Sequence, residues 1–158
     1  MEISALASGS SGNCFYIGNE NEAILVDAGI SAKQTINRLL EIGGNPEKIK
    51  AIFITHEHSD HVRGSDVLAR KLKIPVFATK ATAQKGFLCS DENLIQFIGK
   101  STTLKIGSLK IEAFSKFHSA ADPVSFNVYE NKKVSIITDA GHVCDNIKKH
   151  VSNCNFLF

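Results

Sequence analysis

The segment T-H-E-H-S-D-H, residues 55–61, places three histidines and one aspartate within six positions, directly after the apolar run Lys50–Thr55. Imidazole and carboxylate groups are the ligands that hold zinc, iron or manganese in proteins. His56 and His58 lie two residues apart, so in an extended segment their side chains point the same way. Asp60 and His61 follow where the chain turns toward a helix, and they can face a second point nearby. The spacing therefore predicts two metal ions side by side; the alternative is a solvated polar loop.

Three further residues of ligand type follow apolar runs in the same way, namely Asp27, His118 and Asp139. Strand ends hold side chains rigidly, which is why sites are often built there. Taken alone, an aspartate after a strand is more often a turn residue or a helix N-cap than a metal ligand. Together with His56, the three predict one site at the carboxyl ends of four strands. The apolar runs before them are Glu22–Asp27, Leu109–Lys116 and Val134–Thr138.

The rest of the chain alternates short β-rich runs with turns and a few helices, which predicts an α+β or mixed α/β fold. Ser31 and Gln34 fit a capping box at the start of a helix that ends near Gly43. The other expected helices are Val62–Leu72, Thr79–Leu88 and Val143–Val151. The other expected strands are Ile3–Ala7, Asn13–Gly18, Pro75–Ala78, Leu94–Ile98, Thr102–Ile106, Val124–Glu130 and Asn155–Phe158.

Length and composition set the broad class of the protein. The chain has 158 residues, 43% of them hydrophobic and 22% charged, which fits one globular domain and excludes a disordered protein. A net charge of +2 permits nucleic-acid binding without arguing for it. No apolar run reaches the ~18–20 residues of a membrane span, and Met1–Ser4 does not begin a signal peptide. We therefore expect a cytoplasmic protein with free thiols at Cys14, Cys89, Cys144 and Cys154.

The Gly/Ser loop, Ser8–Asn13, is a candidate phosphate loop. Its glycines would let backbone N–H groups form a concave nest for an anion. The residues that would take part are Ser10, Ser11, Gly12 and Asn13. The loop lacks the pattern of a P-loop, and a flexible hairpin turn explains it equally well.

These motifs carry a family resemblance. T-H-x-H-x-D-H, preceded by a strand that ends in Asp-x-Gly and followed by a late His and a Thr-Asp, resembles the metallo-β-lactamase fold hydrolases. A-S-G-S-S-G-N-C (residues 7–14), L-V-D-A-G-I-S (25–31) and H-S-A-A-D-P (118–123) look like the YycJ/WalJ subgroup, bacterial cytosolic proteins regarded as DNA exonucleases. The resemblance implies an αββα sandwich and a phosphodiesterase or exonuclease that acts on DNA with a dinuclear, metal-activated water.

The resemblance also implies roles for individual residues. His56, His58 and His118 would bind the first metal, Asp60 and His61 would bind the second, and Asp139 would bridge the two. Asp27 would orient the histidine-rich loop by hydrogen bonds. Asp60 and His118 are the residues expected to take part in catalysis. Zinc is the expected metal, with manganese and iron as alternatives.

One part of the family pattern is absent. A further histidine is expected late in the chain, but after Asp139 there are only His142 and His150, and both come too early. We therefore expect residues 1–158 to form a single metallo-β-lactamase-like domain that is incomplete at its C-terminus. An uncovered apolar face around Phe156–Phe158 would then favour self-association. Alternative functions are hydrolysis of a small ester, thioester or lactam, or a non-catalytic metal-binding module.

Overall fold

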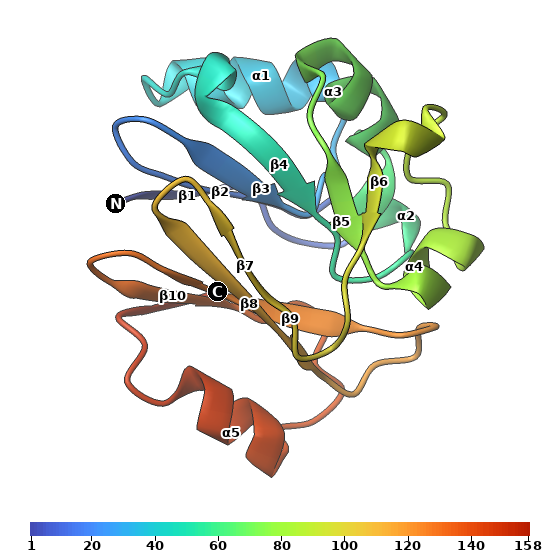
Figure 1. Ribbon diagram of the computed structural model, residues 1–158, viewed down its shortest axis with the longest axis vertical. Helices are drawn as coiled ribbons and strands as arrows, with labels where there is room; N and C mark the ends of the chain where they lie inside the picture. The colour runs from blue at the N-terminus through green and yellow to red at the C-terminus, as the bar shows by residue number, and fades with distance from the viewer.

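The computed structural model describes residues Met1–Phe158 and contains two β-sheets that lie face to face (Figure 1). The six-stranded sheet has the order β1-β2-β3-β4-β5-β6, and the five-stranded sheet has the order β11-β10-β9-β8-β7. The strands of the first sheet are β1 Glu2–Ala7, β2 Cys14–Gly18, β3 Ala23–Val26, β4 Ile49–Phe53, β5 Val76–Ala78 and β6 Ile95–Phe97. Those of the second are β7 Thr103–Ile106, β8 Leu109–Ser115, β9 Val124–Tyr129, β10 Lys133–Ile136 and β11 Phe156–Leu157.

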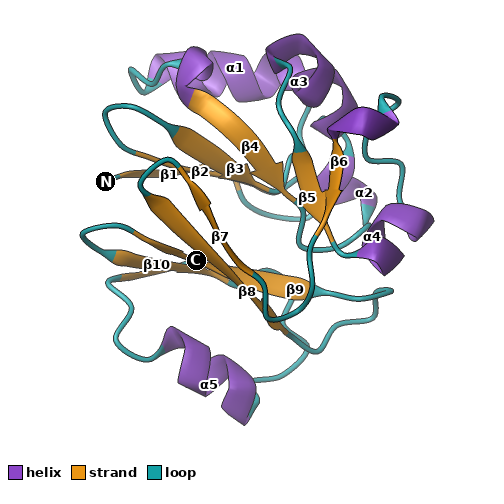
Figure 2. Cartoon of the chain, viewed as in Figure 1, coloured by secondary structure: helices purple, strands orange, loops and turns teal.

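Helices cover the outer face of each sheet, as Figure 2 shows in purple. The helices α1 and α3 pack on the six-stranded sheet, and α5 packs on β8 of the other sheet. This arrangement gives four layers in the order αββα, so the predicted fold class is confirmed. The helices are α1 Ala32–Glu41, α2 Ser59–Val62, α3 Ser65–Leu72, α4 Lys80–Lys85 and α5 Asp145–Val151, with short 3-10 turns at Pro46–Lys48 and Glu92–Leu94.

The strand β3 shows how one short run of sequence serves two cores. All four of its residues are buried, and alternate side chains point to opposite faces of the sheet. Leu25 belongs to the cluster under the helices, whereas Ile24 and Val26 belong to the cluster between the two sheets. A strand buried on both faces must be apolar throughout, which is why A-I-L-V lacks polar alternation.

The structure differs from the sequence prediction where one helix was expected over Val62–Leu72. The helix starts earlier, at Ser59, and breaks between α2 and α3 at Gly64. The N–H group of Gly64 donates to the Ala28 carbonyl at 2.7 Å, and a Cβ at Gly64 would lie 2.1 Å from the Ile30 carbonyl oxygen. The close approach of the loop after β3 therefore replaces the continuous helix.

The carboxyl ends of the strands that carry the predicted site residues meet at one edge of the sandwich. In the first sheet, β3 and β4 run parallel. In the second sheet, β8 and β10 are both antiparallel to β9, so they run in the same direction as each other. The Val124 N–H donates to the Thr55 carbonyl at 2.9 Å and joins the two sheets at this edge.

Three further features bear on the sequence predictions. The structure has no helix with the length and apolar character that a bilayer crossing requires. All four cysteines are free thiols, as predicted. Phe156 and Leu157 on β11 are exposed, with 41% and 57% of their surface accessible.

Candidate metal centre

Asp27 organises the loop that contains the histidines. It follows β3 with a left-handed backbone (φ 59°), and its side chain is fully buried. Its carboxylate accepts the Thr55 N–H at 2.8 Å and the Thr55 hydroxyl at 2.9 Å, and it lies 2.7 Å from Nδ1 of His61. The buried carboxylate therefore contacts both ends of the segment that runs from Thr55 to His61.

Thr55 is a residue whose role the sequence analysis missed, although it begins the decisive motif. Its hydroxyl lies 2.9 Å from Nδ1 of His56, 3.4 Å from Nδ1 of His61 and 3.3 Å from the hydroxyl of Thr138. A single hydroxyl thus contacts two imidazoles and Thr138, which follows β10. The presence of threonine directly before the first histidine was the only signal in the sequence.

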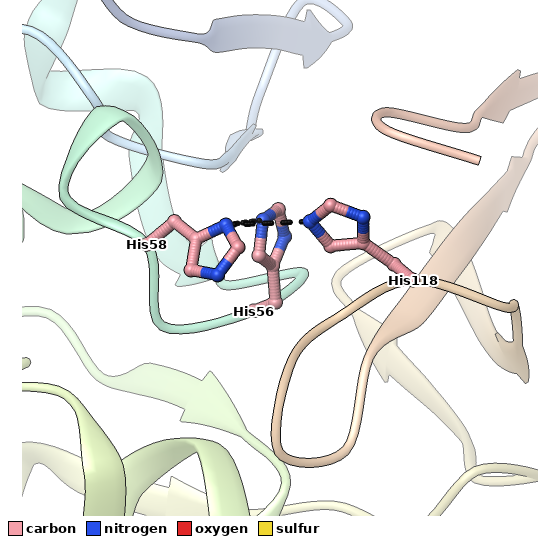
Figure 3. Close-up of side chains that lie close together, drawn as sticks. All are labelled: His56, His58 and His118. Carbon is pink, nitrogen blue, oxygen red and sulfur yellow. Dashed lines mark hydrogen bonds between the residues drawn. The ribbon is translucent and has the colours of Figure 1, made fainter. Parts of the chain in front are cut away.

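Three histidines form the first group of possible metal ligands, and Figure 3 shows their rings turned toward one another. His56 and His58 come from the loop after β4, and His118 comes from the loop after β8 in the other sheet. Nε2 of His56 lies 3.1 Å from Nδ1 of His58, and Nε2 of His118 lies 3.3 Å from the same Nδ1. The nitrogens of all three rings therefore converge on one point.

These distances fit a shared metal ion. Two nitrogen ligands of a tetrahedral ion with bonds of ~2.0–2.1 Å lie about 3.3 Å apart. The nitrogen separations of 3.1 Å and 3.3 Å around His58 match that value. Neutral imidazoles with converging nitrogens are also the donor set that divalent transition metals prefer.

His56, His61 and Asp139 form a second group of possible ligands, with all ligand atoms within 4.8 Å of one another. Oδ2 of Asp139 lies 2.7 Å from Nε2 of His61 and 3.6 Å from Nε2 of His56. Asp27 engages Nδ1 of His61, which leaves Nε2 of the ring to face the group. Asp139 lies after β10 with a left-handed backbone (φ 50°), and this turn aims its carboxylate at the two histidines.

Asp60 lies beside the second group and outside both sets of converging ligands. Its Oδ2 is 3.2 Å from Nε2 of His61 and 3.3 Å from Nδ2 of Asn13. Its backbone carbonyl accepts the Asn13 N–H at 2.7 Å. A Cβ at Gly29 would lie 1.6 Å from that carbonyl oxygen, so a glycine is required where the loop after β3 passes Asp60.

The Gly/Ser loop is only partly available to a ligand. The N–H of Gly12 donates to the Gly9 carbonyl at 3.0 Å, and the N–H of Asn13 is taken by Asp60, so these two amides do not face an anion. The Asn13 side chain points toward the centre, with Nδ2 at 3.2 Å from Nε2 of His61. Ser10 lines a cavity of about 420 Å³ together with Asn13, Asp60 and Asp139, whereas Ser11 and Gly12 do not.

Lys116 is a second residue that the sequence analysis missed. It is a buried lysine at the end of β8, and its ammonium donates to the carbonyl and the hydroxyl of Thr138. Burial lowers the pKa of Lys116 to about 8, and the nearby Asp27 and Asp139 oppose that shift. The lysine ties the strand that leads to His118 to the strand that leads to Asp139.

The electrostatic environment keeps two of the imidazoles neutral in the metal-free chain. Burial, followed by the charges of His61 and Lys116, lowers the pKa of His56 to about 2. Burial and Lys116 also lower the pKa of His118. Burial lowers the pKa of His61 as well, but the hydrogen bond and charge of Asp27 outweigh it, so that this pKa is raised. Neutral rings are the form that binds metals.

Comparison with known proteins identifies the class. The family model of the Metallo-beta-lactamase superfamily matches residues 7–99. The chain therefore belongs to the metallo-β-lactamase superfamily, whose members bind divalent metal ions, and the two ligand groups at the sheet edge fit such ions. The solved structure of the metallo-β-lactamase fold protein YhfI from Bacillus subtilis superimposes with a TM-score of 0.79 at 15% identity, over 98% of this chain and 68% of that one, and this likeness shows the fold alone.

Two curated relatives narrow the comparison to the YycJ/WalJ subgroup that the motifs predicted. The chain is 37% identical to exodeoxyribonuclease YycJ of Bacillus anthracis over 165 residues, which cover 100% of this chain and 62% of the relative. It is 39% identical to exodeoxyribonuclease WalJ of Streptococcus pneumoniae over 163 residues, which cover 98% of this chain and 60% of the relative. The chain thus spans about three-fifths of the length of these relatives.

Proposed function

We propose that this protein is a metal-dependent exonuclease that acts on DNA. The observation that carries the proposal is the convergence of His56, His58 and His118 on one point beside His61 and Asp139, in a chain similar to two exodeoxyribonucleases. We place this activity in the cytoplasm, where the four free thiols would stay reduced. No observation on this structure favours a small ester or lactam as the substrate.

We assign the first metal ion to His56, His58 and His118, and the second to His61 with Asp60 beside it. The same oxygen of Asp139, Oδ2, lies near both His61 and His56, which supports the role of Asp139 as the bridging carboxylate. Zinc suits these imidazole and carboxylate donors, with manganese and iron as alternatives. Bound divalent ions supply Lewis acidity, which makes water nucleophilic at neutral pH and offsets the charge of a phosphodiester.

The chain's own residues then position the reactants. Asp60 is partly exposed and lines the cavity of about 420 Å³, so its carboxylate can orient an attacking water and accept its proton. His118 contributes to catalysis as the histidine ligand that the second sheet supplies. Ser10 lies on the wall of the same cavity, and its hydroxyl can donate to a phosphate oxygen, whereas Nδ2 of Asn13 already donates to the Gly9 carbonyl and to Asp60. Asp27 orients His61 and does not face this cavity.

The test compares the wild-type protein with His58→Ala, because Nδ1 of His58 is the atom that both other rings approach. We expect wild type to release nucleotides from end-labelled DNA after loading with zinc or manganese, and to lose this activity on treatment with a chelator. His58→Ala should lose the activity and bind one ion fewer by elemental analysis. His150→Ala is the control, since that ring stacks on Phe114 away from the centre. Equal DNA cleavage by His58→Ala and wild type would refute the assignment.

A further inference from the structure

An exposed aromatic pair lies next to the metal centre and has no part in the function described so far. Phe117 stands between the buried Lys116 and the ligand His118, yet 59% of its surface is accessible. Its ring stacks on His142, with 4.7 Å between ring centroids and 22° between planes. The Gly141 N–H donates to the Phe117 carbonyl at 2.8 Å and ties the two loops together.

Two connections link the pair to the proposed ligands. Phe117 is adjacent in sequence to His118, and the hydrogen bond from Gly141 joins it to the loop that begins at Asp139. A phenylalanine that is mostly exposed contributes little to the core, so packing within the fold does not account for this ring. The placement instead presents an aromatic surface beside the centre.

A cavity of about 380 Å³ opens beside this surface. Phe117 and His118 both line it, and so does Lys100, whose side chain is 54% exposed. Lys100 lies 2.5 Å from Asp122, but exposed ion pairs of this kind are weak, so its ammonium can contact a phosphate as well. One cavity therefore combines an aromatic wall, a cation and a metal-ligand histidine.

We propose that the Phe117–His142 pair is a stacking platform for a nucleobase of single-stranded DNA, and that Lys100 contacts the adjacent phosphate. The inference rests on the proposed function and names the part of the substrate that this side of the centre holds. An aromatic ring binds any base through its π-face, and an unpaired base has its face free to stack. A cation beside the ring tracks the backbone of the strand.

The test uses the metal-loaded protein and a single-stranded oligonucleotide with cleavage-resistant phosphorothioate linkages and 2-aminopurine as the reporter base. Loss of one base–aromatic stack corresponds to about a 5- to 150-fold weaker affinity. We expect that loss for Phe117→Leu, together with loss of the 2-aminopurine quenching, whereas Phe117→Tyr should retain both. Phe97→Leu is the matched control, because Phe97 is 62% exposed on the edge strand β6.

A second arm separates stacking from charge. An oligonucleotide with an abasic position in place of 2-aminopurine should bind wild type and Phe117→Leu with equal affinity. Lys100→Met should weaken the binding of both oligonucleotides. It should also reduce the slope of the logarithm of affinity against the logarithm of salt concentration by about one. Wild-type affinity in Phe117→Leu would overturn the platform while leaving the nuclease proposal intact. A wild-type protein that neither binds nor cuts DNA would overturn both.

Discussion

At the scale of single residues, the centre depends on side chains that hold other side chains in place. Asp27 contacts Thr55 through two hydrogen bonds and His61 through a third. Thr55 passes this constraint on to His56 and to Thr138 in the other sheet. Because each group is buried and satisfied, loss of any one of them leaves an unpaired donor or acceptor.

We therefore expect Asp27→Asn to weaken binding of the second metal ion. The amide can accept with its oxygen, but its NH₂ group would face either a donor of Thr55 or Nδ1 of His61. The mismatch should cost about 1–3 kcal/mol of unfolding free energy and turn the His61 ring. Metal per chain by elemental analysis and urea unfolding would measure the two effects. Asp145→Asn is the control, because the Asp145 side chain is 99% exposed; equal losses in both variants would contradict the role given to Asp27.

The metal-free chain should lose stability as the pH falls from 7 to 5. The pKa of His56 is about 2 in the folded chain because of burial, against ~6.5 when unfolded. Between these values the unfolded chain binds a proton that the folded chain does not, so the free energy of unfolding decreases as the pH drops. The lowered pKa of His118 adds to this effect, and the raised pKa of His61 opposes it.

Thermal unfolding with a chelator present would measure this dependence. The melting temperature of wild type should fall between pH 7 and pH 5, and the fall should be smaller in His56→Gln, which lacks the titrating ring. His150→Gln should keep the wild-type slope. A His56→Gln variant with an unchanged slope would show that other groups control the acid response.

At the scale of elements, local sequence predicted most of the fold because the sequence of most strands and helices favours the structure that they adopt. The capping box of α1 is present, with the Ser31 hydroxyl accepting the Gln34 N–H. The predicted strands each correspond to an observed one, with bounds that differ by a few residues. The break at Gly64 was missed because its cause, the Ala28 carbonyl, lies in another segment.

The candidate site shows the same difference between features that local sequence encodes and features that depend on distant segments. The ligand-type residues were found because they cluster in one motif or follow apolar runs. Thr55 and Lys116 were missed because their roles depend on contacts with Thr138, which is 83 and 22 residues away in the sequence. The Thr55–Thr138 contact forms only after the two sheets have packed, and the Lys116–Thr138 contact forms only after β8, β9 and β10 have paired within one sheet, so no local sequence pattern predicts either.

The junction of α2 and α3 gives a prediction at this scale. A Cβ added at Gly64 would meet the Ile30 carbonyl, which is backbone and cannot rotate away. Gly64→Ala should therefore destabilise the chain by about 1–3 kcal/mol and displace α2, which carries Asp60 and His61. Gly43→Ala tests a glycine with open space but a φ of 76°, so only backbone strain applies there. Urea unfolding and metal titration would show a loss of metal affinity in Gly64→Ala alone; a loss in both variants would contradict the steric explanation.

At the scale of the whole molecule, the centre lies across the boundary between two sheets. His56, His58 and His61 follow β4, whereas His118 and Asp139 follow β8 and β10. The core between the sheets is apolar and includes Phe53 and Phe126, whose rings meet edge to face at 5.5 Å. The position of the ligands thus depends on how the sheets pack as well as on the loops that carry them.

The hydrogen bond from Val124 to Thr55 therefore lies at the junction of the two sheets. An ion bound to ligands from both sheets would link them at this junction. Sliding of one sheet over the other would separate the two sets of ligands, so a bound ion would oppose that movement in addition to the apolar core. Because such coupling is reciprocal, the free energy by which a bound ion stabilises the packing of the two sheets equals the free energy by which that packing raises the affinity for the ion. Truncation of a core side chain that is not a ligand, such as Phe126, would therefore change the metal affinity.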